Sequence, residues 1–125
     1  MKKEDVILLD SQSYITPACD GKILVAGSHG ARNVGEFTLP HHPKFCVLND
    51  AGIGKNQAAV QGIIYLGENG IPACAVDSMT AMIGDATDTW ENGIISFVNT
   101  VAEEMGVKIG MTVPEACDIV DRASR

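Results

Sequence analysis

The clearest fold signal in the chain is the stretch KFCVLNDAGIGKNQAAVQGIIYLGENGIPACAV, residues 44–76. Two short runs at its ends, 44–48 and 73–76, are almost continuously apolar, which is typical of strands that are covered on both faces. Between them, apolar residues recur every three or four positions over 56–68, and Gly70 follows as a stop signal, so this segment is predicted to be an amphipathic helix. Strand, helix and strand at this spacing predict a βαβ unit with a right-handed crossover.

The same patterns extend outward along the chain. Apolar runs at 6–9 and 22–26 predict two more strands, and the spacing of apolar residues over 93–105 predicts a second helix. A third helix is expected to begin at Thr112, because Glu115 stands three residues later and completes a capping box.

These elements predict an α/β fold in one domain over residues 1–125. We expect three layers: a mainly parallel sheet of four to five strands, with helices on both faces. Residues 1–5 are expected to be a flexible tail. Residues 28–43 and 77–92 are expected to be long connections, which are often functional in compact domains.

Composition excludes several classes of partner. The chain has a net charge of -7, with sixteen acidic and nine basic residues, and the basic residues are scattered. Nucleic-acid-binding domains usually carry a basic stripe, so we expect no nucleic-acid partner, and an anionic membrane surface is disfavoured for the same reason. No segment approaches the ~20 apolar residues of a membrane span. The start of the chain lacks the roughly 7–15 apolar residues of an export signal.

The four cysteines are far apart, and none belongs to a CxxC pair. Two of them, Cys46 and Cys74, lie inside apolar runs, where a free thiol behaves as a small hydrophobic side chain. We therefore expect reduced core cysteines in a cytoplasmic protein. We also expect a homodimer or a higher homo-oligomer, because a small open sheet has edges that must be covered.

Polar residues follow each apolar run of the predicted sheet. If the strands are parallel, these residues gather at one edge, outside the carboxyl ends of the strands, where open α/β sheets bind ligands. The alternative is that they are ordinary turn and cap residues. The predicted ligand-binding residues at this carboxyl edge are Asp10, Ser11, Gly27, Ser28, Gly30, Asn49, Gly52, Gly54, Lys55, Asp77 and Ser78.

His29 is the only histidine at this edge, and imidazole titrates near neutral pH, so it is the candidate general acid or base. Asp50 and Asp85 complete the predicted catalytic set as groups that orient the histidine or stabilise its charge. We expect His29 to lie within about 4 Å of Asp10, Asp50, Asp77 or Asp85, near hydrogen-bonding distance. The alternative is a turn histidine that is bonded to the backbone.

The same edge offers two further candidate ligand sites. The segment 50–55, with its glycines and Lys55, could form an anion pocket, although it lacks the spacing of a nucleotide-binding phosphate loop. Clustered aspartates could hold Mg²⁺, but they are equally good turn and cap residues, and we expect no metal and no cofactor. His41 and His42 precede a strand, so a parallel sheet places them at the opposite edge.

Three strings give a resemblance to known proteins: Gly27-Ser28-His29-Gly30, residues 48–55, and Ile83-Gly84-Asp85. The chain resembles a group of small bacterial α/β proteins with these motifs, and this resemblance implies no activity. Locally, a strand ending in Ser-His-Gly is also similar to caspase-like cysteine peptidases. In those enzymes the next strand ends in the catalytic cysteine, whereas here Asn49-Asp50 occupies that place, so peptidase activity is not implied.

The sequence leaves three functional hypotheses. The first is a small enzyme, a hydrolase or lyase, that acts on a small polar or anionic metabolite through His29. The second is a non-catalytic small-molecule-binding or regulatory subunit that uses the same edge. The third is a structural partner of a larger enzyme. The sequence does not decide whether the chain is an enzyme. The expected partner is a small-molecule ligand.

Overall fold

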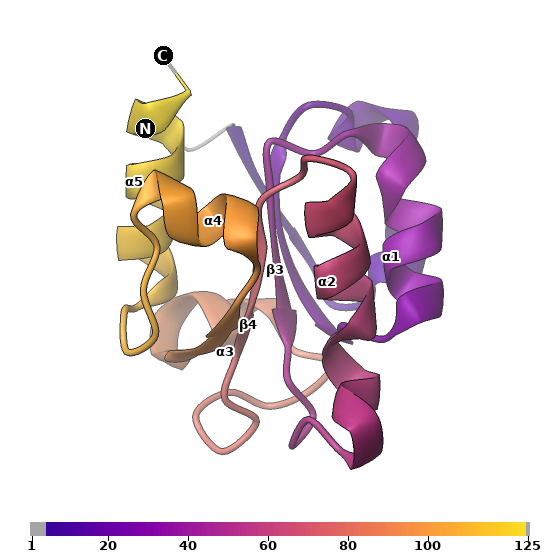
Figure 1. The fold of residues 1–125 in the computed structure, drawn as a ribbon, viewed down its shortest axis with the longest axis vertical. Coiled ribbons are helices and arrows are strands. Elements are labelled where there is room, and N and C mark those ends of the chain that lie inside the picture. Colours follow the sequence, from indigo (N-terminus) through magenta and orange to yellow (C-terminus); the bar gives the residue numbers. More distant parts are fainter. Residues whose placement is uncertain (1–4, 125) are drawn as a thin grey trace.

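The computed structural model describes residues 5–124 and forms one three-layer α/β domain, with the sheet between two layers of helices (Figure 1). The strands of this part of the chain are β1 (Val6–Leu9), β2 (Ile23–His29), β3 (Phe45–Asn49), β4 (Ala73–Val76) and β5 (Ile95–Val98). The helices are α1 (Arg32–Thr38), α2 (Gln61–Glu68), α3 (Ala86–Asn92), α4 (Thr100–Met105) and α5 (Val113–Ala123). Short 3-10 segments are η2 (Gln12–Tyr14), η3 (Pro17–Cys19), η4 (Leu39–His41) and η5 (Lys55–Val60). The predicted fold class is confirmed.

The strands are ordered in space as they are in the chain, from β1 to β5. The first four pair in parallel, as predicted, and β5 pairs antiparallel with β4. The carboxyl ends of β1 to β4 therefore share one edge of the sheet, and the carboxyl edge predicted from the sequence exists.

Each face of the sheet carries its own core. On one face, Cys46 and Leu48 of β3 pack with Val60, Ile63 and other residues of the α1–α2 layer. On the other face, β2, β3 and β4 pack against α5 and the start of α4. Alternate strand residues serve opposite faces, which explains why these runs are apolar without interruption.

Close contact between α1 and α2 depends on two glycines. The main chain of Gly62 in α2 donates a hydrogen bond over 2.8 Å to the carbonyl oxygen of Gly30. A Cβ atom at Gly62 would overlap the carbonyl oxygen of Ala31, and a Cβ atom at Gly35 would lie 2.6 Å from the carbonyl oxygen of Gly62. These helices can approach this closely only because both positions lack a side chain.

The predicted helix over 93–105 is wrong in its first half. Residues 95–98 form β5, and only Thr100–Met105 is helical, with Asn99 as its N-cap. Ile94, Ile95, Phe97 and Val98 are β-branched or aromatic, and they fit a pleated surface better than a helix. The connection from β4 contains α3, and β5 then pairs antiparallel with β4.

Two other boundaries differ from the predictions. The connection 28–43 contains α1, which the sequence did not reveal because Gly35 and Thr38 are weak helix formers. The predicted helix over 56–68 is regular only from Gln61, since Asn56 and Gln57 adopt left-handed backbone angles within η5. The helix expected at Thr112 is confirmed: α5 begins with the full capping box of Thr112 and Glu115.

Other expectations meet the structure in part. Residues 1–4 of the predicted flexible tail lie outside the described residues, and Asp5 forms an ion pair with Lys22 over 3.7 Å. The four cysteines are free and buried, as expected. Among residues 5–124, no helix is long and apolar enough to cross a membrane.

Candidate functional site

The loops that follow β3 and β4 extend beyond the end of the sheet at the carboxyl edge (Figure 1). The loop after β3 runs through residues 50–57, and the loop after β4 runs through residues 77–85. They carry most of the predicted site residues, and hydrogen bonds between them and the strand ends determine what these residues can do.

Asp50 connects three of these segments. Its side chain is buried, with a residue exposure of 5%. Oδ1 accepts hydrogen bonds from the main chain of Gly52 over 2.8 Å and of Ser78 over 3.0 Å, and Oδ2 accepts one from the hydroxyl of Ser96 over 2.6 Å. Burial raises the pKa of Asp50, but the hydrogen bonds from Ser96, Gly52 and Ser78 outweigh it, so the pKa lies below its ordinary value. Asp50 is therefore a charged anchor that joins β3 to both neighbouring segments.

Asn49 supports the same arrangement. It is fully buried, and its amide donates to the carbonyl oxygen of Ala81 over 3.1 Å while its oxygen accepts from the main chain of Ala51 over 2.8 Å. Asn49 and Asp50 thus attach the loop after β4 to the end of β3. We predicted that these residues lie at the edge, and their role there is to fix backbone.

Asp10, Gly27 and Asp85 form a second structural group. Oδ1 of Asp10 accepts from the main chain of Ala86 over 3.0 Å, and Oδ1 of Asp85 accepts from Asp88 over 2.9 Å as the N-cap of α3. A Cβ atom at Gly27 would lie 2.5 Å from the main-chain nitrogen of Asp85 and 2.6 Å from the carbonyl oxygen of Asp10. The start of α3 packs directly on the ends of β1 and β2, and Gly27 makes that approach possible.

His29 does not make the contact that we expected. It is the last residue of β2, its side chain is exposed, and its Nδ1 accepts a hydrogen bond from the main chain of Ala31 over 3.2 Å. Within residues 5–124, no carboxylate lies within ion-pair distance of its ring. The expected contact within about 4 Å of Asp10, Asp50, Asp77 or Asp85 is therefore wrong, because each neighbouring strand end uses its acid to hold backbone.

The predicted serines also serve local structure. Ser28, within β2, accepts a hydrogen bond at its hydroxyl from the main chain of Gln12 over 2.8 Å. Ser11 caps η2, and its hydroxyl lies 2.7 Å from that of Ser13. Gly30 is buried, and its carbonyl oxygen receives the bond from Gly62 described above.

Two residues of importance at this edge were not predicted. Ser96 was assigned to a helix, so its bond to Asp50 could not be expected. Gln12 is fully buried, and its amide nitrogen lies 2.9 Å from Oγ1 of Thr38 and 3.4 Å from the sulfur of Cys46. Its Oε1 has no hydrogen-bond partner among the described residues. A glutamine in a polar loop carries no local signal that it will be buried.

The loop 50–57 has unusual backbone geometry. Ala51, Ile53, Asn56 and Gln57 have φ between 47° and 67°, a region that side chains other than glycine seldom occupy. Ile53 is β-branched, which makes its conformation a true outlier. Gly52 and Gly54 continue the left-handed path, with φ of 77° and 74°. Such strain persists only where surrounding contacts impose it. Asp50 supplies two of them, because its side chain accepts from Gly52 and its carbonyl oxygen accepts from the main chain of Ile53.

Lys55 lies in this strained loop and is exposed. In the described part of the chain it forms no ion pair. Asp77 at the neighbouring loop uses Oδ1 to accept from the main chain of Met79 over 2.8 Å. Lys55 is therefore a cation of loop 50–57 that no carboxylate of the described residues neutralises.

A metal at the carboxyl edge gains no support from the geometry. The described residues contain no group of three or more histidine, cysteine, aspartate or glutamate side chains that could hold an ion. His41 lies at the opposite edge, as expected, where its Nδ1 is 2.6 Å from Oδ1 of Asp20. A groove of about 260 Å³ also lies away from the carboxyl edge, between the end of α2 and the end of β5, with Ile64, Phe97 and Val98 in its lining.

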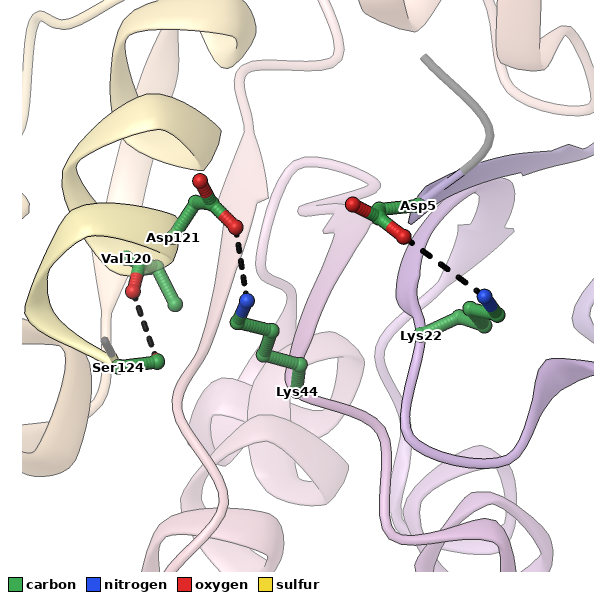
Figure 2. A network of polar contacts seen from close by, with 6 residues as sticks. All are labelled: Asp5, Lys22, Lys44, Val120, Asp121 and Ser124. Carbon is green, nitrogen blue, oxygen red and sulfur yellow. Dashed lines mark hydrogen bonds and ion pairs between the residues drawn. The ribbon is translucent and has the colours of Figure 1, made fainter. Parts of the chain in front are cut away.

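Ion pairs lie at the amino ends of the strands, and one of them joins the sheet to α5 (Figure 2). Lys44, just before β3, lies 2.7 Å from Oδ1 of Asp121, whose residue exposure is 4%. Lys22, just before β2, pairs with Asp5. Opposite charges are thus paired at this edge, whereas Lys55 at the carboxyl edge forms no ion pair within residues 5–124.

Comparison of the chain with protein-family models, with curated proteins and with solved structures gave no match.

Proposed function

We propose that this chain is a non-catalytic binding domain, in which loop 50–57 at the carboxyl edge takes an anionic group of a small molecule. The observation that carries the proposal is the full engagement of Asp50: its oxygens accept from Gly52, Ser78 and Ser96, so none is directed at His29. General acid–base catalysis needs a histidine that a neighbouring group orients and polarises. The polar groups at this edge instead hold a loop in a fixed shape, which is what a binding surface requires.

The geometry of the loop favours an anion. Lys55 supplies an unpaired positive charge in the described part of the chain. It directly follows residues 51–54, whose main-chain N–H groups all donate to residues 49–52 and so fix the shape of the loop that presents the lysine. Because the loop is already held in place, binding would cost little conformational entropy. The ligand class is a small phosphorylated or carboxylated metabolite.

A titration followed by ¹H–¹⁵N NMR tests this proposal, with inorganic phosphate, a sugar phosphate and a dicarboxylate as probes. We expect saturable shifts of the amides in loop 50–57 for at least one probe, and at least a tenfold loss of affinity in Lys55→Gln. Lys108→Gln is the matched control, because Lys108 is an exposed lysine in the loop before α5. Equal affinity in wild type and Lys55→Gln, or shifts confined to the opposite edge, would contradict the proposal.

The oligomeric state is part of the same proposal. Among the described residues no strand pairs with the outer side of β1, and Leu8 on this strand has an exposure of 42%. Exposed apolar edge strands favour pairing with another chain. A homodimer through β1 would give a light-scattering mass of twice 13.2 kDa, and Leu8→Lys would return it to the monomer mass. A monomer mass for the wild type at high concentration would contradict this.

A cytoplasmic location is supported by the state of the cysteines. Burial raises the pKa of Cys46 and of Cys117 to about 12, so these thiols stay protonated and unreactive. Four free, buried cysteines suit a compartment in which thiols stay reduced. Fractionation of cells that express the chain with a small tag would test the location.

A further inference from the structure

Loop 77–85 exposes three large apolar side chains within five residues. The exposed fractions are 90% for Met79, 68% for Met82 and 49% for Ile83. Large apolar side chains that gather on a surface mark contact sites more often than single ones do. Methionine is common at protein-binding surfaces, because its flexible and polarizable side chain fits partners of different shape.

The loop is held firmly, so this exposure is not the result of a loose backbone. Its start is bonded through the main chain of Ser78 to Asp50, and its end through the main chain of Gly84 to the carbonyl oxygen of Gly27 over 2.8 Å. In the middle, Ala81 is buried and its carbonyl oxygen accepts from Asn49. The hydroxyl of Thr80 accepts from the main chain of Ile94 over 3.0 Å.

These bonds turn Ala81 inward and leave Met79, Met82 and Ile83 outside. A surface that is already in its binding conformation loses less entropy when a partner docks. The loop therefore has the properties of a prepared contact site.

The loop and the helix that follows it carry negative charge. Residues 77–92, which form the loop and α3, contain four acidic residues and no lysine, arginine or histidine. Three of the acids, Asp77, Asp85 and Asp88, lie in the loop or at the start of α3. Oδ2 of Asp88 accepts from the main chain of Met82 over 2.7 Å. The side chain of Asn92 and the main chain of Met82 lower the pKa of Asp88, so it is charged at neutral pH.

We propose that Met79, Met82 and Ile83 form a docking surface for a segment of a partner protein that carries lysine or arginine beside apolar side chains. The apolar side chains of that segment would cover the two methionines and the isoleucine, and its basic groups would face Asp77, Asp85 and Asp88. Complementary charge of this kind raises the rate and the specificity of association.

A second copy of the chain fits this surface less well. In a symmetric dimer the same patch meets itself, so the three aspartates of one protomer would face those of the other. Like charges brought together in this way oppose association. The proposal concerns a surface separate from loop 50–57 and does not depend on the anion site.

Selection from a random displayed peptide library on the full chain tests the proposal. We expect enriched peptides to carry several basic residues next to apolar ones, and their affinity to fall as salt rises from about 0.05 to about 0.5 M, because screening weakens charge contacts. The double variant Met79→Ser/Met82→Ser should bind these peptides at least tenfold more weakly. Ile109→Ser is the matched control, since Ile109 is 66% exposed in another loop and its removal should leave affinity unchanged.

Three results would overturn the proposal. The first is enrichment of acidic or neutral peptides only. The second is equal affinity for the wild type and the double serine variant. The third is self-association that disappears in the double variant, which would show that a second copy occupies the surface. The melting temperature of the double variant should match that of the wild type, because the side chains that it replaces contribute little to the core.

Discussion

The hydroxyl of Ser96 in β5 donates a 2.6 Å hydrogen bond to Oδ2 of Asp50 at the end of β3, across the intervening strand β4. The other carboxylate oxygen of Asp50 holds the backbone of both carboxyl-edge loops. One buried, charged side chain therefore fixes the shape of the candidate site, and the stability of the domain should depend on it.

Asp50→Asn should lower the free energy of unfolding by about 2–4 kcal/mol. The amide keeps one acceptor, but it places a donor group against at least one of the three donors that now bond to the carboxylate, and buried groups without partners cost about 1–3 kcal/mol each. Urea denaturation measures this change. Asp77→Asn is the control, because Asp77 is only partly buried and its side chain accepts a single local bond. Equal losses in the two variants would show that Asp50 has no special role.

Acid should remove the contribution of Asp50. Its pKa in the folded chain lies below the ordinary value of 3.8, so the unfolded chain binds more protons between these two values. The stabilisation is complete above the ordinary value and is lost as pH falls through the lowered one. The difference in unfolding free energy between wild type and Asp50→Asn should therefore shrink below about pH 4. A constant difference down to about pH 2 would contradict this account.

Gly62→Ala should destabilise the domain by about 1–3 kcal/mol, because the new methyl group would overlap the carbonyl oxygen of Ala31 and force α1 and α2 apart. Thermal unfolding followed by circular dichroism measures the loss. Glu68→Ala, at an exposed position of the same helix, should stay within about 0.5 kcal/mol of wild type. An alanine variant at position 62 as stable as wild type would show that the helices can shift freely.

Thr112→Ala should cost about 1 kcal/mol, because it removes the hydroxyl that bonds to the main chain and side chain of Glu115. Thr100→Ala is the matched control: Thr100 is exposed at the start of α4, but the N-cap of that helix is Asn99. Chemical denaturation of both variants checks the difference between them. If the two variants lose the same stability, the capping box contributes nothing of its own.

His29→Ala should change the free energy of unfolding by less than about 1 kcal/mol, since it removes one exposed hydrogen bond. It should also leave the NMR shifts caused by anionic probes at loop 50–57 intact. The enzyme hypothesis makes the opposite prediction. If the wild type turns over a small metabolite and His29→Ala does not, the enzyme hypothesis is restored.

Local pattern was sufficient for the central part of the fold. The unit from β3 to β4 and the start of α5 were predicted, because their apolar runs and caps are strong and lie within a few residues of one another. The pattern failed at residues 93–105, where a helical spacing of apolar residues competed with a run of β-branched and aromatic side chains. The partner strand decided the outcome, and pairing with β4 is not encoded in the segment itself.

The position of the candidate site was predictable, but the roles of its residues were not. Parallel strands bring Asp10, Asn49 and Asp50 to one edge whatever these side chains do there. Their roles depend on donors that are distant in the sequence: Ser96 is 46 residues from Asp50, and Ala86 is 76 residues from Asp10. A short polar segment shows that an acceptor is present, but it does not show which donor the folded chain will bring to it.

The strict sequence order of the sheet has a consequence for how the protein is made. Every strand pairs with the strand that left the ribosome just before it, so no strand has to be inserted between two that are already paired. Each new strand therefore joins an edge that is already formed, and no pair of strands has to separate first. Synthesis adds roughly 5–20 residues each second, so the sheet can grow from β1 while β5 is still inside the exit tunnel. Formation of the Ser96–Asp50 bond would then mark the completion of the sheet.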